Sequence, residues 1–195
     1  MDPLEAVEKE LNEATRRAWT LVQSTDGRLF TVRPKPMSWS AAECLAHLSI
    51  SSEMFIPVLK KTIESARPRK TKRKPKMDVI GRVMAWFLEP PIRRRMTTSA
   101  PFVPKSTRAR NEAFGEFVTL QEKLIDLLRA AREVDFGAKV VSPFDRRVRY
   151  NLYSAFRIIA AHERRHLWQA EQAVGELRER NVGRGFSPPF PGEAG

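Results

Sequence analysis

Cysteine is almost absent from this chain of 195 residues, in which Cys44 is the single one. One cysteine excludes an intramolecular disulfide and a zinc site built mainly from thiolates, and it fits a reducing cytoplasm. Glycine is also scarce, and no apolar run approaches the roughly 18 residues of a membrane span. The N-terminal sequence MDPLEAVEKEL is acidic, where a secretory signal peptide is basic. We therefore expect a cytoplasmic protein without a membrane-spanning segment.

Acidic residues are outnumbered, and the excess of positive charge is largely local. The formal net charge is +12, and residues 66–76 contain seven Lys or Arg and no acid. Without that segment the net charge falls by seven, to +5. A like-charged run with prolines repels itself, so we expect a mobile loop. The anion-binding candidates are its central basic residues: Arg69, Lys70, Lys72, Arg73 and Lys74.

Two interpretations of this basic loop stay open. In one, the loop contacts the phosphate groups of nucleic acid or of an anionic membrane surface. In the other, it is a solvated linker that aids solubility. No nucleic-acid-binding motif accompanies the loop and no aromatic residue lies within it, so the linker interpretation is favoured.

Apolar residues recur at helical spacing in four long segments. They predict helices over residues 4–24, 40–65, 107–131 and 151–180. Ser40 and Glu43 form a capping box for the second helix, and Asn151 fits the N-cap of the fourth. The long connection between the second and third helices requires a crossover. The sequence therefore predicts an all-α fold, a four-helix bundle.

The remaining segments connect, cover or extend this bundle. Residues 78–88 are short and very apolar, and they fit a cover for the core, a dimer contact or a membrane-surface segment beside the basic loop. Residues 134–150 form a connection with an extended piece. We expect one domain over residues 1–182, followed by a Pro/Gly-rich tail at 183–195.

Histidine is the other rare residue, and all three histidines fall on helix faces predicted to point inward. His162 and His166 are four residues apart, which places both imidazoles on one face of the fourth helix. His47 lies on the inward face of the second helix. Buried imidazoles cost free energy unless they are hydrogen-bonded or bound to something. Three neutral imidazoles leave positions open on one divalent ion such as zinc or nickel, and a water bound there could act as a nucleophile.

The segment from His162 to His166 also matches the zinc-protease motif H-E-x-x-H. A protease is disfavoured, because both x positions are arginine and neither a downstream ligand nor a strand-rich half is evident. Glu163 lies about 100° around an ideal helix from His162, so it borders the site. There it is a candidate proton acceptor or support for a ligand. The alternative is a solvent-exposed carboxylate paired with Arg164 or with a residue one turn away.

Three further residues lie near the predicted ligands in the sequence. Cys44 precedes His47 by one helical turn and could be a soft ligand or a redox-sensitive thiol, although a buried inert thiol is commoner. Gln169 could hydrogen-bond a ligand or a bound water. Glu43 can reach towards His47, but its capping role already explains it.

Two stretches, WSAAECLAHL from Trp39 and AHERRHLWQ from Ala161, resemble the DinB-like superfamily and its YfiT-type metal-dependent hydrolases. The resemblance covers most of residues 1–180. It implies a four-helix bundle of up-down-down-up topology with a three-histidine site for one divalent ion, often nickel or zinc. Carried over by position, the ligands are His47, His162 and His166. The resemblance also implies a small-molecule substrate, in some members a low-molecular-weight thiol, and in many members a homodimer.

The sequence therefore predicts a metal-dependent hydrolase or small-thiol transferase. The alternative is a non-enzymatic binding protein whose basic loop and apolar segment contact nucleic acid or an anionic membrane. The loop and the apolar segment look unlike the family pattern, so they leave the substrate and the partner open.

Overall fold

The computed structural model describes residues 2–70, 74–91 and 98–184, and it is mainly helical. Its elements are α1 (Pro3–Ser24), α2 (Gly27–Thr31), α3 (Ala41–Ser65), α4 (Val79–Leu88), η1 (Ala100–Phe102), α5 (Arg110–Ala130), η2 (Ala131–Glu133), β1 (Lys139–Val141), β2 (Arg149–Asn151) and α6 (Leu152–Arg184). Strands β1 and β2 form a small antiparallel hairpin. The prediction of an all-α fold is confirmed at this level, with the hairpin as a minor addition.

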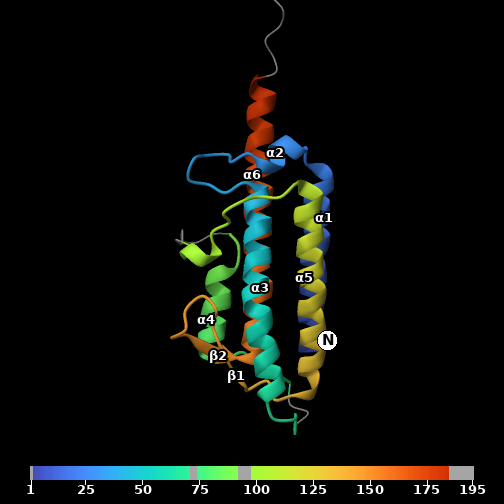
Figure 1. Ribbon diagram of the computed structural model, residues 1–195, viewed down its shortest axis with the longest axis vertical. Coiled ribbons are helices and arrows are strands. Elements are labelled where there is room, and N and C mark those ends of the chain that lie inside the picture. The colour runs from blue at the N-terminus through green and yellow to red at the C-terminus, as the bar shows by residue number, and fades with distance from the viewer. Residues whose placement is uncertain (1, 71–73, 92–97, 185–195) are drawn as a thin grey trace, which may run out of the picture.

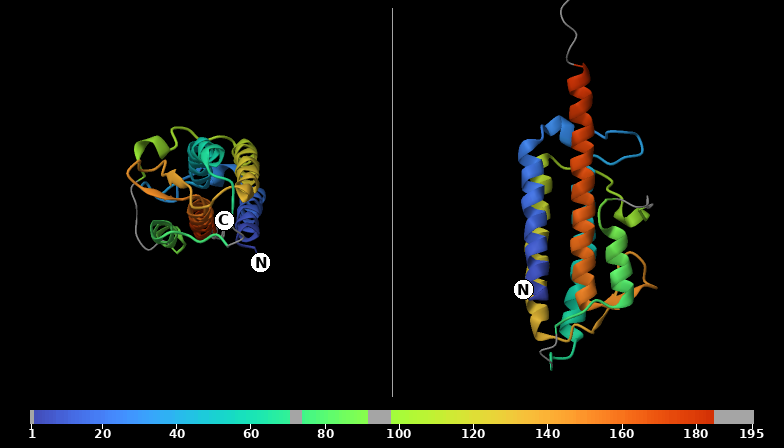
Figure 2. Two further views of the ribbon diagram at one scale, coloured as in Figure 1. Left: turned by 90° about the horizontal axis from the view of Figure 1, so that it is seen from below. Right: turned by 180° about the vertical axis from the view of Figure 1, so that it is seen from behind.

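The four long helices lie side by side (Figure 1). Helices α1 and α6 run upward in that view, whereas α3 and α5 run downward. Helix α4 lies outside this group and packs against α6, as the view from below in Figure 2 shows. In the part of the chain that the structure describes, no helix is both long and apolar enough to cross a bilayer.

Local sequence signals explain where these helices begin. Asp2 caps α1, and Ser40 caps α3 in a capping box with Glu43, as predicted. Asn151 accepts a hydrogen bond from the Ser154 backbone N–H at 2.8 Å, which confirms its predicted role at the start of α6. Each such cap contributes about 1 kcal/mol to stability.

The core consists of two clusters of buried side chains along the helices. One cluster includes Phe55, Leu124 and Phe156, and the other includes Leu45 and Phe117. Fully burying one such side chain contributes roughly 1.5–3 kcal/mol. The second cluster also contains the first residues of α3, so it fixes the part of α3 that carries His47.

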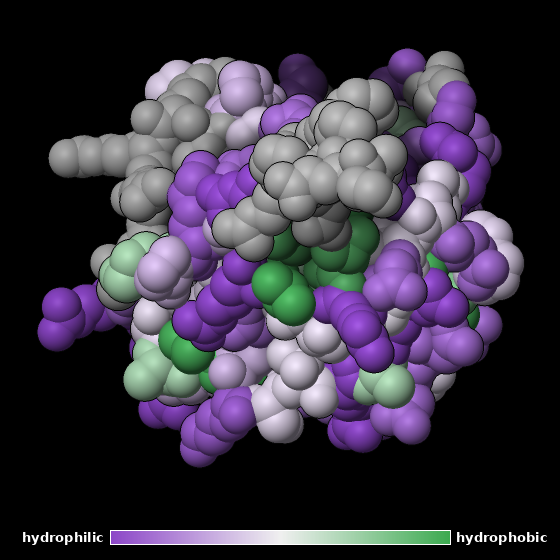
Figure 3. All heavy atoms as spheres, turned by 90° about the horizontal axis from the view of Figure 1, so that it is seen from above, coloured by the Kyte–Doolittle hydropathy of each residue, from purple (hydrophilic) through white to green (hydrophobic). Residues whose placement is uncertain are grey.

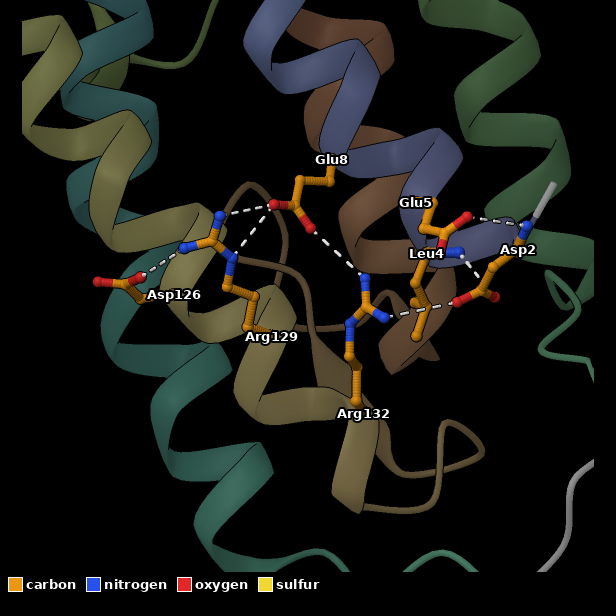
Figure 4. Close-up of polar contacts among 7 residues, drawn as sticks. All are labelled: Asp2, Leu4, Glu5, Glu8, Asp126, Arg129 and Arg132. Atoms are coloured by element: carbon orange, nitrogen blue, oxygen red, sulfur yellow. Dashed lines mark hydrogen bonds and ion pairs between the residues drawn. The ribbon is translucent and has the colours of Figure 1, made fainter.

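Ion pairs join the start of α1 to the end of α5 and to η2 (Figure 4). Glu8 contacts Arg129 at 2.7 Å and Arg132 at 3.4 Å, and Arg132 also lies 3.6 Å from Asp2. These side chains are partly exposed, so each pair contributes at most about 1 kcal/mol.

The opposite end of the molecule, seen from above in Figure 3, is mostly hydrophilic, with hydrophobic side chains gathered near its centre.

Several expectations for the connecting segments need correction. The connection between the first two predicted helices is not wholly irregular, because Asp26 caps the short helix α2. The basic segment is not wholly a mobile loop either, because the Arg69 N–H donates to the Glu133 carbonyl and the Asp135 N–H donates to the Arg67 carbonyl. Helix α6 continues to residue 184, and the rest of the predicted tail lies outside the described residues, so the boundary between domain and tail stays a prediction.

Helix α4 packs tightly on the start of α6, because its backbone at Gly81 lies against the Ser154 side chain. A Cβ atom built on Gly81 would lie 2.1 Å from Ser154 Oγ, so only glycine fits there without a shift. The Asp78 carboxylate accepts hydrogen bonds from the Gly81 N–H, Ser154 Oγ and Lys139 Nζ, each at 3.0 Å. Burial opposes ionisation of Asp78, but these donors outweigh it and hold its pKa below the usual value.

Candidate metal centre

The three histidines of the chain meet between α3 and α6. His47 follows the capping box of α3, and His162 and His166 project from the middle of α6. All three are buried, with 2%, 6% and 7% of their surface exposed. Their candidate ligand nitrogens all lie within 4.8 Å of one another. The structure thus brings together the residues that the sequence singled out as metal ligands.

The orientation of His47 is fixed by a backbone carbonyl. Its Nδ1 lies 2.7 Å from the Phe102 carbonyl oxygen. Because a carbonyl only accepts, Nδ1 carries the proton and Nε2 presents a lone pair. That Nε2 lies 3.1 Å from Nε2 of His162. A carbonyl that orients a ligating imidazole in this way is the usual arrangement in metal sites.

The donor set fits a divalent transition metal. Two nitrogens bound to one tetrahedral zinc at about 2.0–2.1 Å are about 3.3 Å apart, close to the 3.1 Å between His47 and His162. Among the described residues, Nδ1 of His166 is buried and has no hydrogen-bond partner. An unsatisfied buried nitrogen is costly. The imidazoles therefore suit a zinc or nickel ion, while the geometry does not select between them.

Burial keeps the three imidazoles neutral, which is the form that binds metal. Burial is the largest cause that lowers the pKa of His47, and the Phe102 carbonyl opposes it only in part. For His162 and His166, burial lowers the pKa well below its usual value, and neighbouring histidines and Arg165 lower it further. No proton therefore competes strongly for these nitrogens near neutral pH.

Aromatic side chains from three connecting segments cover the histidines. Trp39 precedes α3, and its ring centroid lies 4.9 Å from that of His47 and 5.8 Å from that of His166. Phe144 lies in the β1–β2 turn, 5.4 Å from His162 and 4.6 Å from Phe102 of η1. Trp39 thus packs directly on two of the three histidines. Sequence reasoning missed Phe102 and Phe144 because nothing periodic marks these segments.

Glu163 is buried, so the alternative of a solvent-exposed carboxylate is wrong. Its exposed fraction is 1%, and its Oε2 accepts a hydrogen bond from Nε2 of Gln121 at 3.0 Å. Gln121 also donates to the Leu11 carbonyl at 3.1 Å. Burial raises the pKa of Glu163 to about 8. A polar residue on the apolar stripe of α5 was the signal that could have found Gln121.

The two arginines of the HERRH segment connect α6 to its neighbours. Arg164 reaches Glu89 at 3.0 Å and Glu10 at 2.7 Å, while Arg165 donates to the Phe87 carbonyl at 3.3 Å. Burial lowers the pKa of Arg164, but the hydrogen bonds to Glu89 and Glu10 outweigh it and leave the pKa raised. These arginines therefore serve packing between α6, α1 and α4, in positions where the protease motif permits any residue.

The residues expected near the ligands have distinct surroundings. Cys44 is fully buried in the core, and burial raises the pKa of its thiol, which makes it inert. The Glu43 carboxylate accepts hydrogen bonds from Arg33 at 2.8 Å and from the Ser40 N–H at 2.9 Å. Within the described part of the chain, no hydrogen bond joins it to His47. Burial raises the pKa of Glu43, but the Arg33 and Ser40 donors outweigh it. Gln169 acts to raise the pKa of His166 against the larger effect of burial, but its buried Oε1 has no hydrogen-bond partner among the described residues.

The anion-binding candidates are only partly described. The Arg69 guanidinium lies over the ring of Phe136, 5.3 Å from its centroid. Lys74 is exposed and Lys70 is also at the surface. Lys72 and Arg73 lie outside the described residues. The anion-binding role of these five residues therefore stays a prediction.

Comparison with known proteins agrees with the geometry of the histidine cluster. The family model of the DinB superfamily matches residues 10–170, a range that contains all three histidines. Neither the curated proteins nor the solved structures gave a significant match. The family model nevertheless covers most of the sequence and spans α1 to the middle of α6. The chain therefore belongs to the DinB superfamily.

Proposed function

We propose that the protein is a metal-dependent enzyme, a hydrolase or small-thiol transferase, that works at the three-histidine site. The observation that carries this proposal is the convergence of three buried, neutral imidazoles from α3 and α6. We further propose that α1, α3, α5 and α6 constitute the up-down-down-up four-helix bundle of the superfamily. The bundle holds His47 on one helix and the other two histidines on another.

His47, His162 and His166 would hold one zinc or nickel ion. Such an ion acts as a Lewis acid and lowers the pKa of a coordinated water or thiol. The chain itself supplies a water-poor surrounding, because Trp39, Phe102 and Phe144 pack over the imidazoles. The Phe102 carbonyl fixes the tautomer of His47. This contact orients one of the three ligands before an ion arrives.

Glu163 remains a prediction as a proton acceptor. Its carboxyl group contacts Gln121, so it would have to exchange that hydrogen bond to act on a substrate. With a pKa of about 8, it holds its proton at neutral pH. As a proton acceptor it would first need to be ionised.

Metal content tests the proposal directly. Chelator-treated protein is loaded with zinc or nickel, desalted and measured by elemental mass spectrometry. We expect one equivalent in the wild type and at least a roughly hundredfold loss of affinity in His162→Ala, because a ligand is lost. Glu163→Gln is the matched control, since it changes a buried neighbour that is not a ligand. Absence of metal uptake by the folded wild type under all loading conditions would overturn the proposal.

Activity is tested separately on the loaded protein. Ester and amide substrates report hydrolysis, and electrophiles offered with small thiols report transfer. We expect the metal-loaded wild type to turn over substrate. His166→Ala should abolish this turnover, and added metal should not restore it in the variant. Uptake of metal without turnover in either assay would support the metal site and reject the enzymatic part of the proposal.

A further inference from the structure

Helix α4 presents an apolar face to solvent. Val79, Ile80, Val83 and Trp86 have 64%, 47%, 59% and 58% of their surface exposed. Residues 79, 83 and 86 are spaced at i, i+4 and i+7, so they form one stripe along the helix. Large exposed side chains scattered singly are normal, whereas four on a ten-residue helix form a patch.

The opposite side of α4 is held firmly, which fixes the direction of this face. Gly81, Ala85 and Leu88 are buried against the molecule, and Gly81 meets Ser154 closely. The Glu89 cap residue pairs with Arg164 of α6. Helix α4 lies at the edge of the molecule and not between other helices (Figure 2). A rotation of α4 that buried the exposed stripe would therefore break these contacts between α4 and the rest of the molecule.

The surroundings of this stripe are basic. Lys74 and Lys76 are exposed just before α4, Arg82 is exposed on α4 itself, and Arg149 is exposed on β2, which contacts α4. The residues that cap the two ends of α4 are both acidic, and both carboxylates are paired. Asp78 pairs with Lys139 at 3.0 Å, and Glu89 pairs with Arg164. The apolar face is thus bordered by cations whose charge nothing on α4 neutralises.

From this arrangement we propose that α4 is a membrane-surface helix that binds anionic lipid bilayers. An apolar stripe flanked by Lys and Arg is the pattern of a helix that lies in the headgroup region. Its valines, isoleucine and tryptophan enter the acyl boundary, and the basic residues contact lipid phosphates. Tryptophan favours that interface because its ring has an apolar body and a polar N–H. This role is independent of the metal site.

Two other occupants fit the face less well. Nucleic acid would pair with the cations but would leave the apolar stripe in water. A second copy of the chain would bury the stripe but would bring the basic residues of both copies together. An anionic bilayer satisfies both features at once, because it offers negative charge beside an apolar phase.

Vesicle binding tests this proposal with the full chain. Protein is floated with vesicles of phosphatidylcholine alone or of phosphatidylcholine mixed with phosphatidylserine. We expect binding only to the mixed vesicles, and loss of binding as salt rises from roughly 0.1 M to 1 M, where the Debye length falls from about 10 Å to about 3 Å. The double variant Val79→Ser, Val83→Ser should weaken binding about tenfold or more.

A second variant addresses charge. In this variant Lys74, Lys76 and Arg82 are each replaced by Gln. Each lost cation should weaken the affinity for anionic vesicles roughly fivefold. Matched controls are Met37→Ser, which changes a residue 89% exposed elsewhere, and a triple neutralisation of Arg28, Lys105 and Lys123. We expect both controls to bind vesicles as the wild type does. Circular dichroism and thermal unfolding show that each variant is folded.

Four results would overturn the proposal. The folded wild type could bind neither kind of vesicle, or the controls could lose as much binding as the α4 variants. Alternatively, duplex DNA or RNA could bind with unchanged affinity when Val79 and Val83 are serine, which would favour nucleic acid. A dimer in sedimentation that the valine variant dissociates, without any vesicle binding, would assign the face to a second copy of the chain.

Discussion

At the scale of single residues, the buried pair of Glu163 and Gln121 is chemically unusual. Each side chain keeps one buried oxygen that has no hydrogen-bond donor among the described residues, Oε1 in both cases. A protonated Glu163 relieves part of this cost, because a neutral carboxyl is cheaper to bury than a carboxylate. This agrees with the raised pKa of about 8.

Glu163→Gln should therefore stabilise the metal-free protein at neutral pH. The pKa of Glu163 is raised from 4.5 to about 8 on folding, so its contribution to stability is complete below pH 4.5 and is lost as pH rises to about 8. The loss is about 1.4 kcal/mol per pH unit within that window. The amide of the variant stays neutral and can donate to Oε1 of Gln121. Urea unfolding at several pH values should show that the advantage of the variant grows with pH. Parallel curves for both proteins would contradict this assignment.

At the scale of secondary-structure elements, the packing of α4 against α6 depends on the absence of a side chain at Gly81. Gly81→Ala should destabilise the protein by about 1–3 kcal/mol, because the added Cβ overlaps Ser154 and the helix has to shift. Gly115→Ala is the matched control, since a Cβ there meets nothing within 4 Å on α5. The control should gain about 0.5–1 kcal/mol from helix propensity. Urea unfolding measures both changes, and an equal gain at both positions would exclude the tight contact.

The elements also show what a sequence can predict. Apolar periodicity and caps such as Ser40 located α1, α3 and α6 to within a few residues, because these signals are local. The pairing of Arg67 and Arg69 with residues 133–135 was missed, since composition alone predicts a free loop. Phe102 and Phe144 were missed because they lie in segments far from the histidines in the sequence, and only the tertiary fold brings them together. Local patterns therefore predicted the ligands, and tertiary structure supplied their cover.

At the scale of the whole molecule, stability should depend jointly on pH and metal. Burial lowers the pKa of the three histidines, so their contribution is present above the unfolded value of 6.5 and is lost as pH falls below it. An ion at a hundred times its Kd should add about 2.7 kcal/mol. Protons compete with the metal in acid, so this gain should shrink there.

Thermal unfolding with and without zinc or nickel measures this dependence at about pH 7.5 and about pH 5.5, on either side of the usual histidine pKa. We expect a rise in Tm on loading at the higher pH, and little or none at the lower pH. His166→Ala should show no rise at either pH. An equal rise in the variant would mean that the ion binds elsewhere in the protein.

The separation of the ligands along the chain has a further consequence. His47 and His162 are 115 residues apart in sequence, yet their nitrogens lie 3.1 Å from each other. An ion shared by them would act as a cross-link that closes a very long loop. A covalent link over roughly 100 residues raises the free energy of the unfolded chain by about 4.7 kcal/mol at room temperature, because it removes chain entropy. A chain with one cysteine cannot form such a link from its own thiols. The histidine cluster would give it a reversible one, made or released by the supply of metal.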